Sequence, residues 1–319
     1  MSIMLSLDFD FLPFVLGETG ASAMPIKRPD GSSGSVHPMM CFDWGHNEGH
    51  ASLLQAILWQ TRYACLLNHG YDPEKEVAIR PLDQKCVSID KFIHDVSRKI
   101  GRWEDAPLWY ADSHAHGLTV AQAAWIMNGK RPITILHFDA HSDLAYSEGM
   151  AHKARTEWSV DCGSWLYGCL AMGLTDRVRV VYPDWKDASR DKPTKAKSKW
   201  LKGFWRRIKF YSYSEWLAEA KPDSDRVLFT NACRSSSWTP PWLDADFERL
   251  ISLIPRSYAK CLDCDKRYQR IGGHDACKRR AWSREDAQAY ATQRRELWTA
   301  GKAQAGAMDA PKPGVVIIP

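Results

Sequence analysis

The residues of this chain best suited to chemistry form an Asp-x-His-x-Asp sequence directly after an apolar run. Residues 133–138 read Ile-Thr-Ile-Leu-His-Phe, and Asp139, His141 and Asp143 follow. A β-strand points residues i, i+2 and i+4 to the same side, so an extended backbone would bring these three side chains together. Two carboxylates and an imidazole at one point can bind a divalent metal ion. We therefore predict metal binding rather than a polar turn, which rarely needs this density of charge.

The N-terminus repeats the pattern. Residues 3–7, apolar except for Ser6, lead into Asp8 and Asp10. Taken alone, this Asp-x-Asp pair is equally well explained as a turn or a helix N-cap. If its strand lies beside strand 133–138, however, four carboxylates and a histidine share one cleft. That charge cannot be buried without cations, so the two segments together predict a two-metal site.

These acidic segments must be positioned by the elements around them, in which predicted strands and helices alternate. The predicted strands are 2–9, 85–90, 108–111, 133–138, 177–182 and 226–230, and the predicted helices are 51–69, 119–128, 162–172 and 243–254. This alternation is typical of an α/β fold with three layers, in which an open, mainly parallel sheet has helices on both faces. Ligands in such folds bind at the carboxyl ends of strands, where both acidic segments fall. Residues 17–49, rich in Gly, Pro and Ser, are predicted to be a long loop bordering the site.

Composition favours one large domain with a small appendage. A content of 45% hydrophobic and 25% charged residues is ordinary for a globular protein and allows a large core. After Pro255 the sequence turns polar and basic, which predicts a domain over 1–255 and an appendage over 256–319 whose tail is disordered. Basic residues crowd into 186–207 and 267–284. We interpret them as solvated faces, with a docking surface for an acidic partner as the alternative, and no nucleic-acid motif accompanies them.

The cysteines and the N-terminus bear on the compartment. Nine cysteines, no secretory signal and no uncharged run of about 18 residues favour a cytoplasmic protein with reduced thiols and no membrane association. Cys261, Cys264, His274 and Cys277 have ligand types compatible with a structural Zn²⁺ site, although ordinary thiols are the preferred interpretation. The sequence leaves open whether the protein is a monomer or a homo-oligomer.

The two acidic segments resemble motifs of the ureohydrolase superfamily, which includes arginases and agmatinases. Residues 137–143 are similar to its Asp-Ala-His-x-Asp motif, residues 6–10 to its Ser-x-Asp-x-Asp motif, and residues 112–114 to its Asp-His element. Within the superfamily the chain resembles a divergent branch that includes peptide arginases, on the evidence of residues 7–12, 43–46, 162–166 and 234–241. Those enzymes convert arginine side chains of ribosomally made peptides to ornithine.

The order of the motifs differs from that of arginases, in which the Asp-x-Asp strand follows the Asp-Ala-His-x-Asp strand. In this chain the Asp-x-Asp strand comes first, an order that a permuted arginase-like sheet could accommodate. A rival pair, Asp263 and Asp265, has the usual order. We favour Asp8 and Asp10, because the rival pair follows a shorter apolar run and is followed by Lys266 and Arg267.

The resemblance implies a binuclear manganese centre with six ligands. They would be Asp8 and Asp139, which bridge both ions, His114 and Asp143 at one ion, and His141 and Asp10 at the other. His116 is the alternative to His114. Such a centre makes hydroxide available at neutral pH, and Asp143 would orient it. Oxygen-rich coordination suits Mn²⁺ better than Zn²⁺.

Candidates for substrate binding lie outside the metal motifs. In residues 43–50, Glu48 would pair with the guanidinium group, Trp44 would stack on it, and His46 would protonate the leaving amine. A surface loop with a helix N-cap explains these residues equally well. His152 is an alternative proton donor. Ser235, at another predicted strand end, would line the pocket unless it forms a cap or turn.

The predicted function is hydrolysis of arginine side chains in a precursor peptide, giving ornithine and urea. Fifteen tryptophans suit a groove that grips a peptide. The elements that recognise free arginine in arginases are not recognisable in this chain. The alternatives are an amidohydrolase of the same fold acting on a small guanidino compound or an acetylated amine, and a metal-binding scaffold without turnover.

Overall fold

The centre of the fold is a seven-stranded sheet. The fold is taken from a computed structural model, which describes residues 2–15, 24–27, 33–36, 59–64, 66–67, 72–79, 86–186, 192–219, 226–236, 238–262 and 284–305. The strand order is β11-β6-β10-β1-β7-β8-β9, and each neighbouring pair is parallel. The strands are β1 (Ser2–Asp8), β6 (Leu108–Ala111), β7 (Ile133–Phe138), β8 (Thr175–Tyr182), β9 (Ile208–Ser212), β10 (Arg226–Cys233) and β11 (Ala259–Cys261). The predicted parallel α/β sheet is therefore confirmed, and all carboxyl ends lie at one edge.

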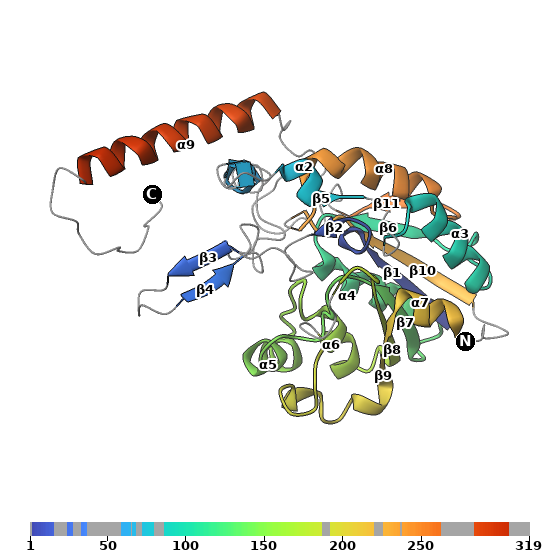
Figure 1. The fold of residues 1–319 in the computed structure, drawn as a ribbon. Helices are drawn as coiled ribbons and strands as arrows, with labels where there is room; N and C mark the ends of the chain where they lie inside the picture. Colours follow the sequence, from blue (N-terminus) through green and yellow to red (C-terminus); the bar gives the residue numbers. More distant parts are fainter. Residues whose placement is uncertain are drawn as a thin grey trace.

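Helices cover both faces of the sheet, as predicted (Figure 1). One face carries α3 (Ile89–Lys99), α7 (Tyr213–Ala218) and α8 (Asp244–Leu253). The other face carries α4 (Gly117–Met127), α5 (Glu148–Thr156) and α6 (Trp165–Ala171). The helix α2 (Pro73–Glu76) and two antiparallel pairs, β2 (Phe14–Val15) with β5 (Val77–Ala78) and β3 (Met24–Lys27) with β4 (Ser33–Val36), lie outside the sheet. The predicted continuous loop over 17–49 is wrong where β3 and β4 form this hairpin.

The alternation of apolar side chains fixes the orientation of the central strands. In β1, Leu5 and Leu7 pack under α3 and α8, whereas Met4 packs with α4 and α6. Burying such a side chain contributes roughly 1.5–3 kcal/mol, so a one-residue slip of the strand would be costly. Residues with the parity of Met4, among them Ser6 and Asp8, must therefore point to the side of α4 and α6.

Two predicted elements differ from the structure. The strand predicted at 85–90 is wrong, because the Ser88 side chain accepts a hydrogen bond from the Lys91 backbone N–H and caps α3. Ile89, Phe92 and Val96 are buried at helical spacing, a period that the strand prediction overlooked. The helix predicted over 162–172 begins three residues later. The predicted helix over 51–69 is confirmed where it is described, at residues 59–64 and 66–67.

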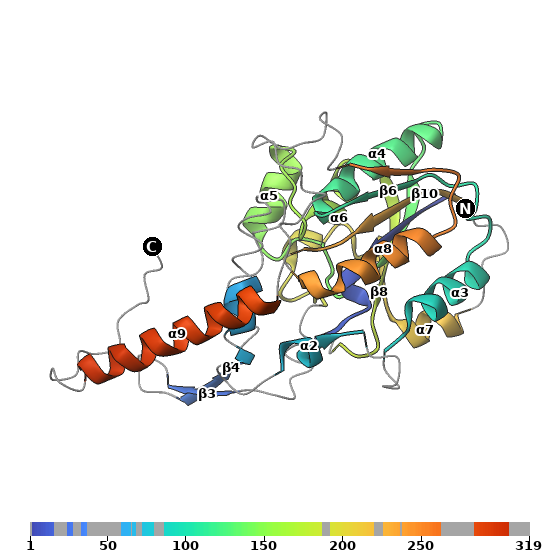
Figure 2. The same ribbon diagram turned by 90° about the horizontal axis from the view of Figure 1, so that it is seen from above.

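The chain beyond residue 255 begins inside the main fold. β11 pairs with β6 at the edge of the sheet, so the sheet extends past the predicted domain boundary. The helix α9 (Arg284–Ala305) follows and leads away from the sheet in both views (Figures 1 and 2). Within the described ranges, no helix combines the length and the apolar character needed to span a bilayer.

Candidate metal centre

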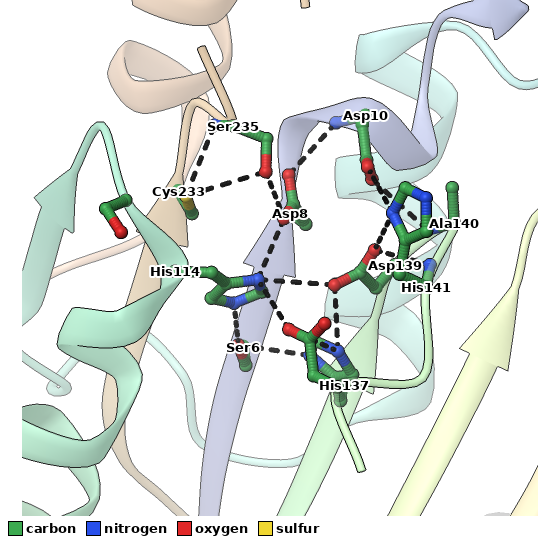
Figure 3. A network of polar contacts seen from close by, with 12 residues as sticks. Ser6, Asp8, Asp10, His114, His137, Asp139, Ala140, His141, Cys233 and Ser235 are labelled. Atoms are coloured by element: carbon green, nitrogen blue, oxygen red, sulfur yellow. Dashed lines mark hydrogen bonds and ion pairs between the residues drawn. The ribbon is translucent and has the colours of Figure 1, made fainter. Parts of the chain in front are cut away.

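The two acidic segments meet at the carboxyl edge of the sheet. β1 and β7 are parallel neighbours in which Ser6 is paired with His137 and Leu7 with Phe138. Asp8 and Asp139 therefore emerge side by side (Figure 3). They have the parity of Met4 and Ile135, which pack with α4 and α6. The strand adjacency on which the sequence prediction depends is present.

Their side chains form three overlapping groups with two further residues. These are His114, which follows β6, and Cys233, which ends β10. Within each group the potential ligand atoms lie within 4.8 Å of one another. The groups are His114, His137, Asp139 and Asp143; Asp10, Asp139 and His141; and Asp8, His114 and Cys233. They contain all six predicted ligands, and they contain His114 rather than His116. Asp139 and His114 each belong to two groups, whereas Asp8, the other carboxylate predicted to bridge, belongs to one.

The group around His114 is deeply buried. His114 Nδ1 lies 2.8 Å from Oδ2 of Asp8, 3.2 Å from Oδ2 of Asp139 and 3.2 Å from Oδ2 of Asp143. The Nε2 atom of His137 lies 2.9 Å from the same Asp139 oxygen. Two imidazoles thus face three carboxylates in a space closed to water.

The group around His141 lies on the other side of Asp139. His141 Nδ1 is 2.8 Å from Oδ2 of Asp10 and 3.5 Å from Oδ1 of Asp139. Backbone amides fix both carboxylates, because the Ala140 N–H donates to Asp10 and the His141 N–H donates to Asp139. The His141 ring packs against Trp238 with a centroid distance of 4.4 Å.

His114 reaches the centre from a strand that is not adjacent to β1. β6 lies beyond β10 in the sheet, and its chain turns back in a short 3₁₀ helix, η4 (His114–His116), which the Ser113 hydroxyl caps. Gly117 follows, and a Cβ atom there would lie 2.7 Å from the Trp165 ring. Glycine at this position leaves room for the Trp165 ring, whose centroid lies 5.1 Å from that of the His114 ring.

Asp143 is delivered by a turn and not by a continuing strand. β7 ends at Phe138, and the φ angle of Asp143 is +51°, a left-handed conformation. The Asp143 carbonyl accepts hydrogen bonds from the backbone of Leu166 and Tyr167 at the start of α6, and its Oδ2 accepts one from Trp165 Nε1 at 2.7 Å. The expectation that an extended strand orients Asp143 is therefore wrong, because these contacts of α6 hold the turn.

Burial and crowding shift the proton affinity of the cluster. Burial, followed by the charges of Asp10, Asp8 and Asp143, raises the pKa of Asp139 well above its ordinary value. Burial and the charge of Asp10 raise the pKa of Asp8 to about 6. For His141, burial lowers the pKa, but the charge of Asp10 and hydrogen bonds to Asp10 and Asp139 outweigh it and leave the pKa well above its ordinary value. Without a cation the cluster holds protons, which a metal ion would replace.

The residues fit a metal ion. His137 Nε2 and Asp139 Oδ2 are buried, and neither has a hydrogen-bond partner within the described part of the chain, although they are 2.9 Å apart. Buried polar atoms are rarely left in this state unless something else satisfies them. Imidazole nitrogens and carboxylate oxygens are ordinary ligands of divalent ions. The group of His114, His137, Asp139 and Asp143 can hold a metal ion.

The other predicted site residues divide into two sets. Ser235 lies in the centre, where its buried hydroxyl donates to Asp8 Oδ2 at 2.5 Å, so it orients a potential ligand. The remaining ones lie outside the described residues: Trp44, His46, Glu48, Cys264, His274 and Cys277. Of the predicted zinc ligands, Cys261 alone is described, and it ends β11.

Sequence reasoning missed His137 and Ser6. The signal was present, because the alternation that relates Asp139, His141 and Asp143 begins two residues earlier at His137. Comparisons of the chain with protein-family models, with curated proteins and with solved structures find no match.

Proposed function

We propose that the protein is a manganese-dependent hydrolase that cleaves the guanidinium group of arginine side chains in a peptide. The observation that carries this proposal is the adjacency of β1 and β7, which gives two ligand groups that share Asp139. One group would be completed by His114 and Asp143, and the other by His141 and Asp10. The reaction is inferred from the motif resemblance, and the two ligand groups are consistent with a two-metal centre.

Divalent ions at such a centre act as Lewis acids and lower the pKa of water, so that hydroxide is available near neutral pH. In the reaction, the oxygen of water bonds to the guanidinium carbon, the bond from that carbon to the side-chain nitrogen breaks, and a proton passes to the leaving amine. Urea and ornithine are the products. A guanidinium group is cationic and resonance-stabilised, so it needs both a strong nucleophile and a carboxylate to hold it.

The chain's own residues would position the reactants. Trp165 and the turn at Asp143 hold that carboxylate toward the centre. The side chain of His141 is 16% exposed, whereas that of His114 is 1% exposed, so substrate would approach from the His141 side. As the sequence predicts, Glu48 would bind the guanidinium group and His46 would donate the proton.

A cavity beside α5 and α6 could accept part of a peptide substrate. It has a volume of about 460 Å³ between α5, α6 and residues 199–204, and its lining includes Arg155, Lys199, Lys202 and Trp200. The Trp200 indole donates a hydrogen bond to the carbonyl of Leu144, the residue after Asp143. The three cations outnumber the one acidic lining residue, Glu148, so the cavity would suit acidic side chains near the target arginine.

Metal content and urea release test the proposal. Protein prepared with Mn²⁺ should contain about two ions per chain and release urea from an arginine-containing peptide with acidic flanks, but not from free arginine. Asp139→Asn should lose both ions and lower kcat by at least about a thousandfold. Asp176→Asn, an exposed carboxylate at the opposite end of β8, is the matched control and should behave as wild type.

The outcomes separate the candidate functions. Urea release from small guanidino compounds alone, or amine release from acetylated amines, would select the corresponding alternative hydrolase. Stoichiometric metal binding without turnover of any of these substrates would select the scaffold.

A further inference from the structure

We infer that His137 is a seventh metal ligand and that Ser6 orients both His137 and His114, which makes the two metal positions chemically unequal. The inference deepens the proposed function, because it concerns the same centre. It assigns a nitrogen ligand that the six-residue set lacks.

His137 is placed as a ligand by the strand itself. It lies on β7 two residues before Asp139, so both side chains point to the same face of the sheet. The imidazole is fully buried, and its Nε2 atom lies 2.9 Å from Asp139 Oδ2 and 3.7 Å from Asp143 Oδ2. Nevertheless, Nε2 forms no hydrogen bond within the described part of the chain. Such close contact without hydrogen bonding is expected where lone pairs point to a common centre and not at each other.

Ser6 connects the two buried imidazoles from the side away from the carboxylates (Figure 3). Its Oγ atom lies 2.9 Å from His114 Nε2 and 3.3 Å from His137 Nδ1. A hydroxyl oxygen has two lone pairs and can accept from both rings. Each ring then carries its proton on the nitrogen that faces Ser6 and offers a lone pair to the centre.

With Ser6 as the acceptor from both rings, the two histidines have opposite tautomers. His114 is protonated on Nε2 and binds through Nδ1, whereas His137 is protonated on Nδ1 and binds through Nε2. Hydrogen bonds of this kind fix the tautomer and the orientation of metal-binding histidines. Ser6 is thus a positioning residue and not a ligand.

The consequence is an unequal pair of positions. The buried position offers the nitrogens of His114 and His137 with the carboxylates of Asp139 and Asp143, whereas the other offers one nitrogen, that of His141, with Asp10 and Asp139. The seventh residue, Asp8, lies 2.8 Å from His114 and adds a carboxylate to the buried side, so the positions still differ by two nitrogens against one. Imidazole-rich sites favour borderline ions such as Co²⁺ and Zn²⁺, while oxygen-rich sites favour Mn²⁺. The buried position should take up Co²⁺ first.

A Co²⁺ titration of the metal-free, full-length protein tests this without any substrate. Visible absorption should show a tighter first equivalent and a weaker second one. His137→Asn should weaken the first equivalent by at least about a hundredfold and change its spectrum, while the second keeps its affinity. His94→Asn, an exposed imidazole on α3, is the matched control. Wild-type affinity and spectrum in a folded His137→Asn protein would overturn the assignment.

Nitrogen NMR of wild-type protein with ¹⁵N-labelled histidine gives a test that needs no variant. One equivalent of Zn²⁺ should shift Nδ1 of His114 and Nε2 of His137, and the opposite nitrogen of each ring should remain protonated. An unshifted His137 signal would refute its role as a ligand.

Ser6→Ala should lower the affinity of the first equivalent by about 10- to 100-fold, and Ser6→Thr, which keeps the hydroxyl, should restore it. Because no turnover is measured, a failed hydrolysis assay leaves these outcomes unaffected.

Discussion

The two sides of Asp139 differ in how they are enclosed. On one side His114 and His137 are fully buried, oriented by Ser6 and packed against Trp165. On the other side the His141 side chain is 16% exposed and packs on Trp238. The closed side has few degrees of freedom and can define the geometry of the centre. In the proposed function, the open side is the one that a substrate would reach. The carboxylate of Asp139 is shared by the two sides.

The largest expected effect of this difference is on stability. His114→Asn should lower the free energy of unfolding of the metal-free protein by about 3–5 kcal/mol, because it leaves the buried Asp8, Asp139 and Asp143 without their counter-charge. His141→Asn should cost about 1–2 kcal/mol, since water can reach that position. Chemical denaturation of both variants measures the difference.

The same two variants separate folding from turnover. His141→Asn should retain the metal ion of the closed side and lose activity, whereas His114→Asn should lose both. Equal losses of stability in the two proteins would show that the two sides are not distinct.

The second expected effect is on the pH dependence of metal binding. In the metal-free protein, burial lowers the pKa of His114, but the charge of Asp8 and hydrogen bonds to Asp139 and Asp143 outweigh it and raise the pKa well above its ordinary value. A cation must displace this proton, so affinity should fall as pH falls, by about tenfold per pH unit for each proton displaced. Below about pH 6, Asp8 binds a further proton and the decline should steepen.

Asp10 should not contribute to that steepening. Burial would raise its pKa, but the charge of His141 and a hydrogen bond to it lower the pKa below its ordinary value. Mn²⁺ affinities measured between about pH 5 and pH 8, a range that spans the ordinary pKa of histidine, check the prediction. Asp8→Asn should lose the steeper part. Because the charge of Asp8 also raises the pKa of His114, the remaining dependence should shift to lower pH. A flat profile for wild type would contradict the prediction.

The smallest expected effects concern the two tryptophans. Trp165→Phe removes the donor to Asp143 but keeps a ring against Gly117, so metal affinity should fall by about 10- to 100-fold. Trp238→Phe should leave metal affinity unchanged and raise KM by less than about tenfold, equivalent to 1.4 kcal/mol of lost contact. Isothermal titration and steady-state kinetics measure the two changes. A larger loss of metal affinity in Trp238→Phe would reverse the assignment of the two sides.

The sequence by itself determined the local features. The apolar runs before Asp8 and Asp139 fix two buried strands, because strands covered on both faces need continuous apolar residues. Strand periodicity then relates Asp139 to His137, although that residue was overlooked. The parallel α/β class also follows from local patterns, since strands that alternate with helices are joined by crossovers.

Only the tertiary structure decided the rest. Strand order places β1 between β10 and β7, and it results from packing on both faces that no segment encodes alone. It brings His114 across β10 to Asp8 and pairs Ser6 with His137. The left-handed turn at Asp143 is likewise held by α6, more than twenty residues later. Residue types and spacing thus specified which ligands exist, and long-range packing decided which of them meet.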